Sequence, residues 1–316
     1  MELRRLGNTD LKTAPIVFGG NVFGWTTNEK ESFDLLDEFL DMGFNMIDTA
    51  DVYSKWADGN KGGESESIIG KHLKIRGNRH KIVLATKVGS SMKQGGNSNL
   101  SKAYILNQVE ESLRRLQTDH IDLYFTHKDD ENTPIEETLE AYEKLIDQGK
   151  VRYIGASNLS ASRLKNSLEI SEKENLPKYE VFQPEYSLVN RKDFEGEILK
   201  ICKDHHLGVT SYFSLASGFL TGKYSSKKEI SGSSREMFLK DYFDDRGQKI
   251  LADLKDISDH RNKSQAGIAL RWIIQRPGIT APIASTTNSE QFTSFKEAIS
   301  FELSRDEMEK LNQASS

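Results

Sequence analysis

Seven polar residues stand directly after short apolar runs, where the chain is expected to leave a buried strand. They are Asp48, Lys87, His127, Ser157, Asn158, Gln183 and Tyr212. Each alone has an ordinary structural explanation, such as capping a helix or pairing at the surface. Together they are stronger evidence, because the carboxyl ends of parallel barrel strands meet at one rim, where active sites are found. The pattern therefore predicts a catalytic or binding site at that rim.

The apolar runs predict eight strands, which alternate with amphipathic helical segments. The strands are expected over residues 14–18, 44–47, 82–86, 121–125, 151–156, 179–182, 208–211 and 279–283. The helices are expected over residues 33–42, 64–74, 101–116, 134–145, 160–173, 193–205, 264–275, 289–298 and 304–313. Such alternation is typical of a parallel sheet covered by helices, and eight strands can close into a barrel.

We therefore expect one α/β domain over residues 1–316, a (β/α)8 TIM barrel with extra helices at its C-terminal end. The short runs on either side of Gly7-Asn8 predict a β-hairpin from about Leu3 to Thr13, closing the bottom of the barrel. Ser101 and Ser160 are placed to cap the helices that follow them, and Pro134 suits a first helical turn. Residues 217–248, rich in Ser, Gly and Lys, interrupt the alternation and predict a long loop.

The composition excludes several classes of protein. The 316 residues carry a net charge of −5 with acids and bases mixed, so a nucleic-acid partner is not expected. No apolar stretch approaches the ~18 residues of a membrane span, and no signal peptide is visible, so we expect no membrane partner and a cytoplasmic location. The single cysteine, Cys202, can form neither an internal disulfide nor a cysteine-based zinc site, and the histidines are scattered, so no metal site is expected. An oligomer is possible.

Four stretches of the chain resemble the aldo-keto reductases, in particular bacterial NADP-dependent oxidoreductases and, more distantly, the potassium-channel beta subunits. Residues 43–53 read Gly-Phe-Asn-Met-Ile-Asp-Thr-Ala-Asp-Val-Tyr, with an Asp and a Tyr five residues apart. Residues 112–116 read Ser-Leu-Arg-Arg-Leu, followed by Ile-Asp-Leu-Tyr at 121–124 and His127. Residues 149–158 end in Gly-Ala-Ser-Asn, and residues 215–224 end in Leu-Thr-Gly-Lys-Tyr. The resemblance extends from about residue 3 to residue 310.

The resemblance implies a catalytic tetrad of Asp48, Tyr53, Lys87 and His127. A carbonyl that accepts a hydride develops negative charge on its oxygen, and Tyr53 would deliver the proton to that oxygen. An unperturbed phenol titrates at about 10. Lys87, held by Asp48, would lower the pKa of Tyr53 toward the working range, and His127 would orient the carbonyl through a hydrogen bond.

The resemblance also implies a dinucleotide cofactor, NADP with NAD possible, held by the rim loops; no G-x-G-x-x-G loop is present. It assigns Ser157, Asn158 and Gln183 to the nicotinamide carboxamide and Tyr212 to the nicotinamide ring. Ser214, Leu215 and Ser217 are assigned to the pyrophosphate. Gly20 and Asn21 are assigned to the ribose next to the nicotinamide, with Asp48 close by. Two departures from the family occur. Phe213-Ser214-Leu215 stands where Ser-Pro-Leu is common, and residues 283–291 lack the basic residue that often faces the 2′-phosphate.

Without that basic residue, the choice between NADPH and NADH depends on weaker groups. Ser285, Thr286, Asn288 and Gln291, near the start of the last barrel helix, could bind a phosphate through hydroxyl, amide and backbone N–H groups. We therefore expect a mild preference for NADPH.

Two other functions are open at this stage. A lysine at the end of a barrel strand can form a Schiff base, so Lys87 also allows an aldolase; the Asp48 and Tyr53 pair and the Ser157-Asn158 motif argue against it. Alternatively, the chain could be a nucleotide-binding sensor or channel-subunit-like protein with slow turnover. Borohydride trapping on Lys87 would identify the aldolase, and turnover with reactive aldehydes would separate an enzyme from a sensor.

The expected substrate is a small or medium aldehyde or ketone. Four aromatic residues follow predicted strands and could form the mouth of the pocket: Phe23, Trp25, Trp56 and Tyr186. Such flat apolar groups suit an uncharged carbonyl compound held by packing. Lys55 and Arg191 are the cations noted in these loops, so a strongly anionic substrate is less favoured.

Overall fold

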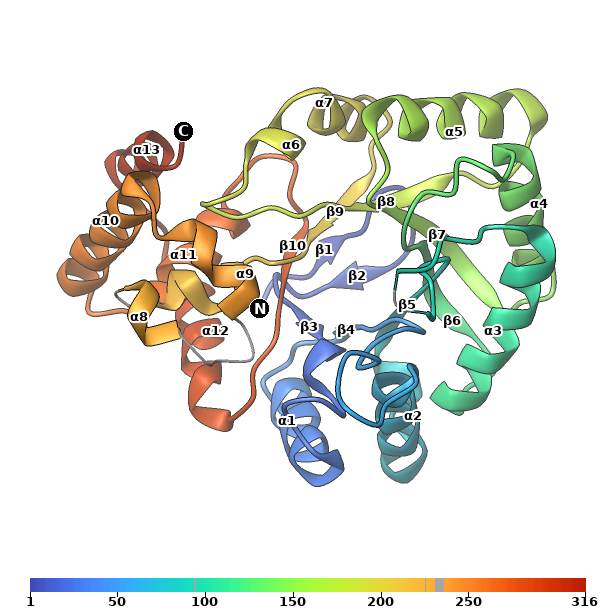
Figure 1. Cartoon of the computed structure of the whole chain (residues 1–316), viewed down its shortest axis with the longest axis horizontal. Coiled ribbons are helices and arrows are strands. Elements are labelled where there is room, and N and C mark those ends of the chain that lie inside the picture. Colours follow the sequence, from blue (N-terminus) through green and yellow to red (C-terminus); the bar gives the residue numbers. More distant parts are fainter. Residues whose placement is uncertain (94, 225, 231–235) are drawn as a thin grey trace.

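Eight parallel strands form a closed barrel in the computed structural model, which describes residues 1–93, 95–224, 226–230 and 236–316 (Figure 1). The strands are β3 (Val17–Gly19), β4 (Met46–Asp48), β5 (Val83–Val88), β6 (Ile121–Thr126), β7 (Val151–Ser157), β8 (Tyr179–Gln183), β9 (Gly208–Ser211) and β10 (Ala281–Ala284). Each pairs with its successor, and β10 pairs with both β9 and β3 to close the ring. The predicted TIM barrel is confirmed.

The predicted N-terminal hairpin is also present, as the antiparallel pair β1 (Arg4–Arg5) and β2 (Lys12–Thr13). Its connecting residues include Leu6 and Leu11, which are almost fully buried against the residues that fill the barrel. The hairpin therefore closes the end of the barrel opposite the carboxyl ends of the strands, and Figure 1 shows it lying across the centre of the ring.

Helices surround the barrel, as Figure 1 shows. The α-helices are α1 (Glu29–Asp41), α2 (Glu64–Arg76), α3 (Lys102–Leu116), α4 (Ile135–Asp147), α5 (Ala161–Glu174), α6 (Lys192–Glu195), α7 (Glu197–Asp204), α8 (Lys227–Ile230), α9 (Glu236–Leu239), α10 (Asp245–Arg261), α11 (Gln265–Ile274), α12 (Phe292–Ala298) and α13 (Arg305–Ala314). The 3₁₀ segments are η1 (Gly20–Val22), η2 (Arg79–Lys81), η3 (Ala216–Thr221), η4 (Lys240–Tyr242) and η5 (Ser289–Gln291). None of the helices in the described ranges is long and apolar enough to cross a membrane.

Several predicted boundaries were wrong. The helix expected over 193–205 is divided into α6 and α7 at Gly196, whose ψ of −124° is not helical. The loop expected over 217–248 contains η3, η4, α8, α9 and the start of α10, although part of this stretch lies outside the described residues. Ser101 stands at the N-cap position of α3 without capping it, because its hydroxyl lies 2.8 Å from Oδ1 of Asn99. Ser160 does cap α5, accepting a hydrogen bond from the Arg163 backbone N–H.

The two-residue alternation of the strands determines which side chains reach the rim. Successive side chains of a barrel strand point alternately into the barrel and toward the helices. In β5, Val83 and Ala85 belong to the cluster inside the barrel, whereas Leu84 packs with the helices outside. Lys87 continues the inward row at the carboxyl end of the strand. The same two-residue step leads from Met46 to Asp48, from Phe125 to His127 and from Val181 to Gln183.

Candidate active site

Lys87 is the centre of the polar cluster at the carboxyl rim of the barrel. It is fully buried, and its Nζ donates hydrogen bonds to Oδ2 of Asp48 at 2.5 Å, to the Thr49 carbonyl at 2.8 Å and to the Tyr53 hydroxyl at 2.9 Å. An ammonium has three hydrogens, so each has its own acceptor. Thr49 was not among the residues predicted from the sequence, because it contributes a backbone carbonyl that any residue type could supply.

The protonation states of Tyr53 and Lys87 follow from burial and from their contact. Burial raises the pKa of Tyr53 above its ordinary value, and the charge of Lys87 offsets only part of that rise. The expectation that Lys87 would lower the pKa of Tyr53 below that of a free phenol is therefore wrong. Burial acts to lower the pKa of Lys87, but Asp48 and Tyr53 outweigh it and leave the pKa raised. At neutral pH Lys87 is an ammonium and Tyr53 a neutral phenol that can donate a proton.

His127 lies beside Tyr53, with ring centroids 5.9 Å apart. Its backbone N–H donates to the Val88 carbonyl at 2.8 Å, which joins the ends of β5 and β6. Burial, together with the charges of Lys87, Lys128 and Lys55, holds the pKa of His127 well below its ordinary value. The Nδ1 atom of His127 is buried and has no hydrogen-bond partner among the described residues. A neutral imidazole in this position can donate one hydrogen bond to a ligand.

The lowered pKa of His127 predicts a pH dependence of stability. In the unfolded chain a histidine titrates near 6.5, so acidification below that value protonates the unfolded state first and the free energy of unfolding falls. The loss continues until the pH reaches the lower pKa of the folded state. We expect the His127→Gln variant to show a shallower fall between pH 6.5 and pH 5, by at most about 1.4 kcal/mol per pH unit. Urea unfolding at several pH values measures this.

A matched control for that experiment is His80→Gln, at an exposed position in η2. The control should show the same fall of the free energy of unfolding with pH as the unmodified protein. Equal slopes for the His127→Gln variant and the unmodified protein would contradict the assignment of a neutral imidazole.

Asp48 connects the lysine to the predicted cofactor residues. Its Oδ1 accepts a hydrogen bond from Nε2 of Gln183 at 2.9 Å, while its Oδ2 accepts from Lys87. The Gln183 carbonyl in turn accepts from the Ser157 hydroxyl at 2.8 Å. Asp48, Gln183 and Ser157 are each about 1% exposed. The ends of β4, β5, β7 and β8 are therefore joined by one buried chain of hydrogen bonds.

Asn158 and Tyr212 extend this chain to the open side of the rim. Nδ2 of Asn158 donates to the His127 carbonyl at 2.9 Å, and its Oδ1 accepts from the Tyr212 hydroxyl at 2.7 Å. Asn158 has a left-handed backbone, with φ of 56°, a conformation that asparagine tolerates better than most residues. The backbone of Tyr212 is also fixed, because its N–H donates to the Pro184 carbonyl and its carbonyl accepts from the Tyr186 N–H. The Tyr212 ring is thus held at both ends.

The loop after Tyr212 has an unusual backbone. Phe213, Ala216, Ser217 and Gly218 all have positive φ values, between 47° and 100°. The Ser214 side chain is buried, and its hydroxyl donates to the Ser211 carbonyl at 3.0 Å, so that hydroxyl does not face a ligand. Leu215 and Ser217, also predicted near the pyrophosphate, are partly exposed. A run of left-handed residues can aim successive backbone N–H groups toward an anion.

The remaining predicted cofactor residues lie where β3 and β10 meet. Gly20 and Asn21 belong to η1, directly after β3. The Ser285 hydroxyl lies 2.6 Å from the Gly19 carbonyl and 2.7 Å from Oδ1 of Asn21. These contacts join the two strand ends that close the barrel, and they place Ser285 beside Asn21.

The segment after Ser285 is built differently from the expectation. The Thr286 hydroxyl is buried and has no hydrogen-bond partner among the described residues, so it does not present its oxygen at the surface. Asn288 caps η5, with its Oδ1 accepting from the Gln291 N–H at 3.2 Å. The Gln291 side chain returns to the Thr287 N–H at 2.9 Å. Of the residues predicted to bind a phosphate here, Asn288 and Gln291 are the exposed ones.

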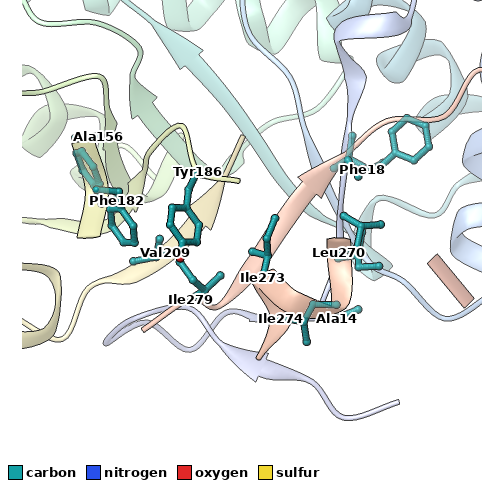
Figure 2. Packing of buried hydrophobic residues seen from close by; sticks show 14 of the residues in the cluster. Ala14, Phe18, Ala156, Phe182, Tyr186, Val209, Leu270, Ile273, Ile274 and Ile279 are labelled. Atoms are coloured by element: carbon teal, nitrogen blue, oxygen red, sulfur yellow. The ribbon is translucent and has the colours of Figure 1, made fainter. Parts of the chain in front are cut away.

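Two of the four aromatic residues expected at the mouth of the pocket lie in the core instead. Phe23 is fully buried and stacks on Phe18 with centroids 5.2 Å apart. Tyr186 is 1% exposed and stacks on Trp272 at 5.5 Å, and Figure 2 shows its ring among the apolar side chains of the core. Their predicted role at the mouth is therefore wrong, because long-range partners bury them.

The other two aromatic residues do stand next to Tyr53. The Trp56 ring lies 5.8 Å from the Tyr53 ring and 5.7 Å from the Trp25 ring, which it meets at 90°. Trp56 is 45% exposed. Of the two cations predicted in these loops, Arg191 does not face the mouth. It forms a bidentate ion pair with Glu195 and donates a hydrogen bond to the Asn312 carbonyl. Lys55 remains near the mouth.

The cluster offers a proton donor, a buried ammonium and amide side chains around one rim, an arrangement suited to the reduction of a carbonyl. No group of three or more His, Cys, Asp or Glu side chains that could hold a metal ion occurs in the described part of the chain.

Comparison with known proteins agrees with this chemistry. A model of the aldo/keto reductase family matches residues 15–316. The chain is 36% identical to the uncharacterized oxidoreductase YrpG of Bacillus subtilis, over 99% of this chain and 95% of that protein. It is 31% identical to the aldo-keto reductase YhdN of Bacillus subtilis, over 99% and 93%, and 32% identical to a probable voltage-gated potassium channel subunit beta of Arabidopsis thaliana, over 95% and 91%. The chain therefore belongs to the aldo/keto reductase family and is an oxidoreductase of that family.

Proposed function

We propose that this protein, acting as a single domain over residues 1–316, reduces small aldehydes and ketones with NAD(P)H, and that Tyr53 donates the proton. The observation that carries the proposal is the continuous set of hydrogen bonds from Tyr53 through Lys87, Asp48 and Gln183 to Ser157. It connects a proton donor with the residues assigned to the cofactor. A structural ion pair alone would not need a phenol and an imidazole at the same rim.

The residues at this rim fit a nicotinamide dinucleotide. A carboxamide needs both a donor and an acceptor. Asn158 can supply an acceptor through its Oδ1, because its Nδ2 already donates to the His127 carbonyl and the Ser157 hydroxyl, and Gln183 has a second N–H besides the one that it donates to Asp48. The ring of Tyr212, fixed at its hydroxyl and its backbone, offers a flat face for stacking. Nearby, the left-handed residues Phe213 and Ala216 to Gly218 suit the approach of a pyrophosphate to the backbone.

The chemistry divides among the chain's own residues. A bound reduced nicotinamide would supply the hydride. As the carbonyl oxygen gains negative charge, Tyr53 gives it a proton, and the neighbouring Lys87 ammonium stabilises the phenolate that remains. Asp48 holds the ammonium in position from its other side. The neutral imidazole of His127 orients the carbonyl by donating a hydrogen bond.

The Schiff-base alternative is disfavoured by the surroundings of Lys87. A Schiff base requires an unprotonated amine that can reach a carbonyl carbon. The raised pKa of Lys87 keeps it protonated, and all three of its hydrogens are directed at oxygens of Asp48, Thr49 and Tyr53. Borohydride in the presence of an aldehyde should therefore leave Lys87 unmodified.

The sensor alternative draws on relatives named as channel subunits. It differs from the reductase in one measurable respect, the rate of turnover. We would mix the protein with NADPH and a panel of reactive aromatic and aliphatic aldehydes and follow the loss of NADPH absorbance. Multiple turnovers support the reductase, whereas tight nucleotide binding with no consumption across the panel would favour the sensor.

The family resemblance favours NADPH over NADH, and the lack of a cation in residues 285–291 limits the expected preference to a mild one. Residues 285–291 offer Ser285, Asn288 and Gln291 as neutral polar groups, and the charged residue among them, Glu290, is acidic. Neutral hydrogen bonds contribute about 1 kcal/mol each, so we expect a preference of about tenfold or less in kcat/KM. Dissociation constants from tryptophan fluorescence give a second readout. Equal or better kcat/KM with NADH would contradict this preference.

A further inference from the structure

We propose that the substrate carries a carboxylate close to its carbonyl, and that Lys55 and Lys128 bind this carboxylate at the mouth of the site. The inference rests on the proposed carbonyl reduction and names its substrate class. It revises the expectation of an uncharged substrate. That expectation named Lys55 and Arg191 as the cations of these loops, whereas Arg191 is paired with Glu195 and Lys128 is a second lysine near the mouth.

Lys55 is held at the rim by its position and by its contact. It follows Tyr53 by two residues, is partly buried, and its Nζ donates a hydrogen bond to the Ser91 carbonyl in the loop after β5. The ammonium therefore lies between the loop that carries Tyr53 and the loop that follows Lys87. A carbonyl acceptor leaves two of its hydrogens available for another partner.

Lys128 stands on the next loop, directly after His127, and is exposed. Neither Lys55 nor Lys128 forms an ion pair with a carboxylate of the described residues, whereas the adjacent Asp129 is neutralised by Arg163 at 2.9 Å. The buried Lys87 is likewise neutralised by Asp48. The two lysines therefore add positive charge to this side of the mouth, and neither of them is paired with a carboxylate of the described residues.

The electrostatic effects on neighbouring groups show that these lysines act on one region. Both of their charges help to lower the pKa of His127, after burial and Lys87. Burial has the largest effect on Lys55 and lowers its pKa, while the charge of Asp51 acts to raise that pKa and the charge of Lys128 acts to lower it. Two ammonium groups that repel each other and also reach the same imidazole are suited to share an anion between them.

The aromatic groups beside these lysines limit where the anion would lie. Trp56 follows Lys55 directly, contacts Tyr53 and is 45% exposed. A flat substrate that packs on Trp56 with its carbonyl at Tyr53 would keep its far end near the two ammonium groups. An aromatic aldehyde with a carboxylate on the ring meets both requirements.

The test compares 4-carboxybenzaldehyde with 4-carbamoylbenzaldehyde, which has nearly the same shape without the charge. Steady-state rates with saturating NADPH are measured for the unmodified protein and for Lys55→Gln, Lys128→Gln and the double variant. The control is Lys74→Gln, an exposed lysine of α2 that forms no ion pair with the described residues.

We expect the unmodified protein to favour the carboxylate through a lower KM. Each single variant should raise that KM about 2- to 5-fold, and the double variant should remove most of the preference. Raising the salt concentration should weaken the preference as well. Lys74→Gln should behave like the unmodified protein.

Three results would overturn the inference. Equal KM values for the two aldehydes in the unmodified protein would show that no anion site exists, while leaving the proposed reductase intact. An equal loss of kcat with both aldehydes in the lysine variants would show that the two charges act on the developing alkoxide instead. No consumption of NADPH with either aldehyde would overturn the proposed function itself, and this inference with it.

Discussion

We expect the Tyr53→Phe variant to lose at least about 10²-fold in kcat, the usual size of general acid catalysis. Tyr53 is the phenol that accepts a hydrogen bond from Lys87, and burial keeps its proton in place at neutral pH. Phenylalanine retains the ring and its contact with Trp56 but has no proton to give. The fold and the cofactor residues are not touched by the change, so nucleotide affinity should stay nearly constant.

The measurement pairs kcat for a reactive aldehyde with the dissociation constant of NADPH. Tyr153→Phe is a suitable control, because its hydroxyl lies 3.5 Å from the Asp10 N–H at the opposite end of the barrel. The control should keep full activity. Near-normal kcat in Tyr53→Phe would show that another group delivers the proton, and a large loss of nucleotide affinity would place Tyr53 in the cofactor site.

The ends of the strands could be predicted from the sequence because a polar residue interrupts an apolar run at each of them. Asp48, Lys87 and Gln183 are visible in this way, since burial on both faces of a barrel strand leaves few other polar residues. Because both rows of side chains are apolar, the sequence does not say which row faces inward. That distinction requires the register of the closed barrel.

The loops could be predicted much less well, because distant partners determine their structure. Tyr186 appears in the sequence as an aromatic residue next to a predicted site residue. Its burial depends on Trp272, on which it stacks, and on Glu195 and Arg276, which bond to its hydroxyl. Trp56 has the same kind of local sequence, but its ring contacts among the described residues are with Tyr53 and Trp25, and it remains 45% exposed.

The pKa of Tyr53 illustrates the same limit for electrostatics. The sequence predicts a lysine near the phenol, which acts to lower the pKa, and that contact is present. The sequence does not indicate how far the site is removed from water. Burial has the larger effect and reverses the sign of the shift. The identity of the proton donor could be proposed from the sequence, but its protonation state required the structure.

Lys87→Met is expected to abolish turnover. It should also destabilise the protein by about 3–5 kcal/mol, the usual cost of removing one partner of a buried ion pair and leaving the other charge unpaired. Methionine has nearly the length of lysine, so packing changes little. Asp48 is about 1% exposed, and among the described residues its carboxylate would keep only the hydrogen bond from Gln183. Tyr53 would lose the charge that stabilises its phenolate. Urea unfolding and kcat measure the two effects.

The double variant Lys87→Met/Asp48→Asn separates stability from catalysis. Asparagine carries no charge, and its Oδ1 can still accept the hydrogen bond from Nε2 of Gln183, so the buried charge disappears while that contact remains. We expect most of the lost stability to return, because the cost in the single variant comes from the unpaired carboxylate. Activity should stay absent, because Tyr53 still lacks the ammonium. If the double variant regains activity along with stability, Lys87 holds the fold together and has no part in the reaction. If the single variant is as stable as the unmodified protein, the pair is not energetically coupled as its 2.5 Å contact implies.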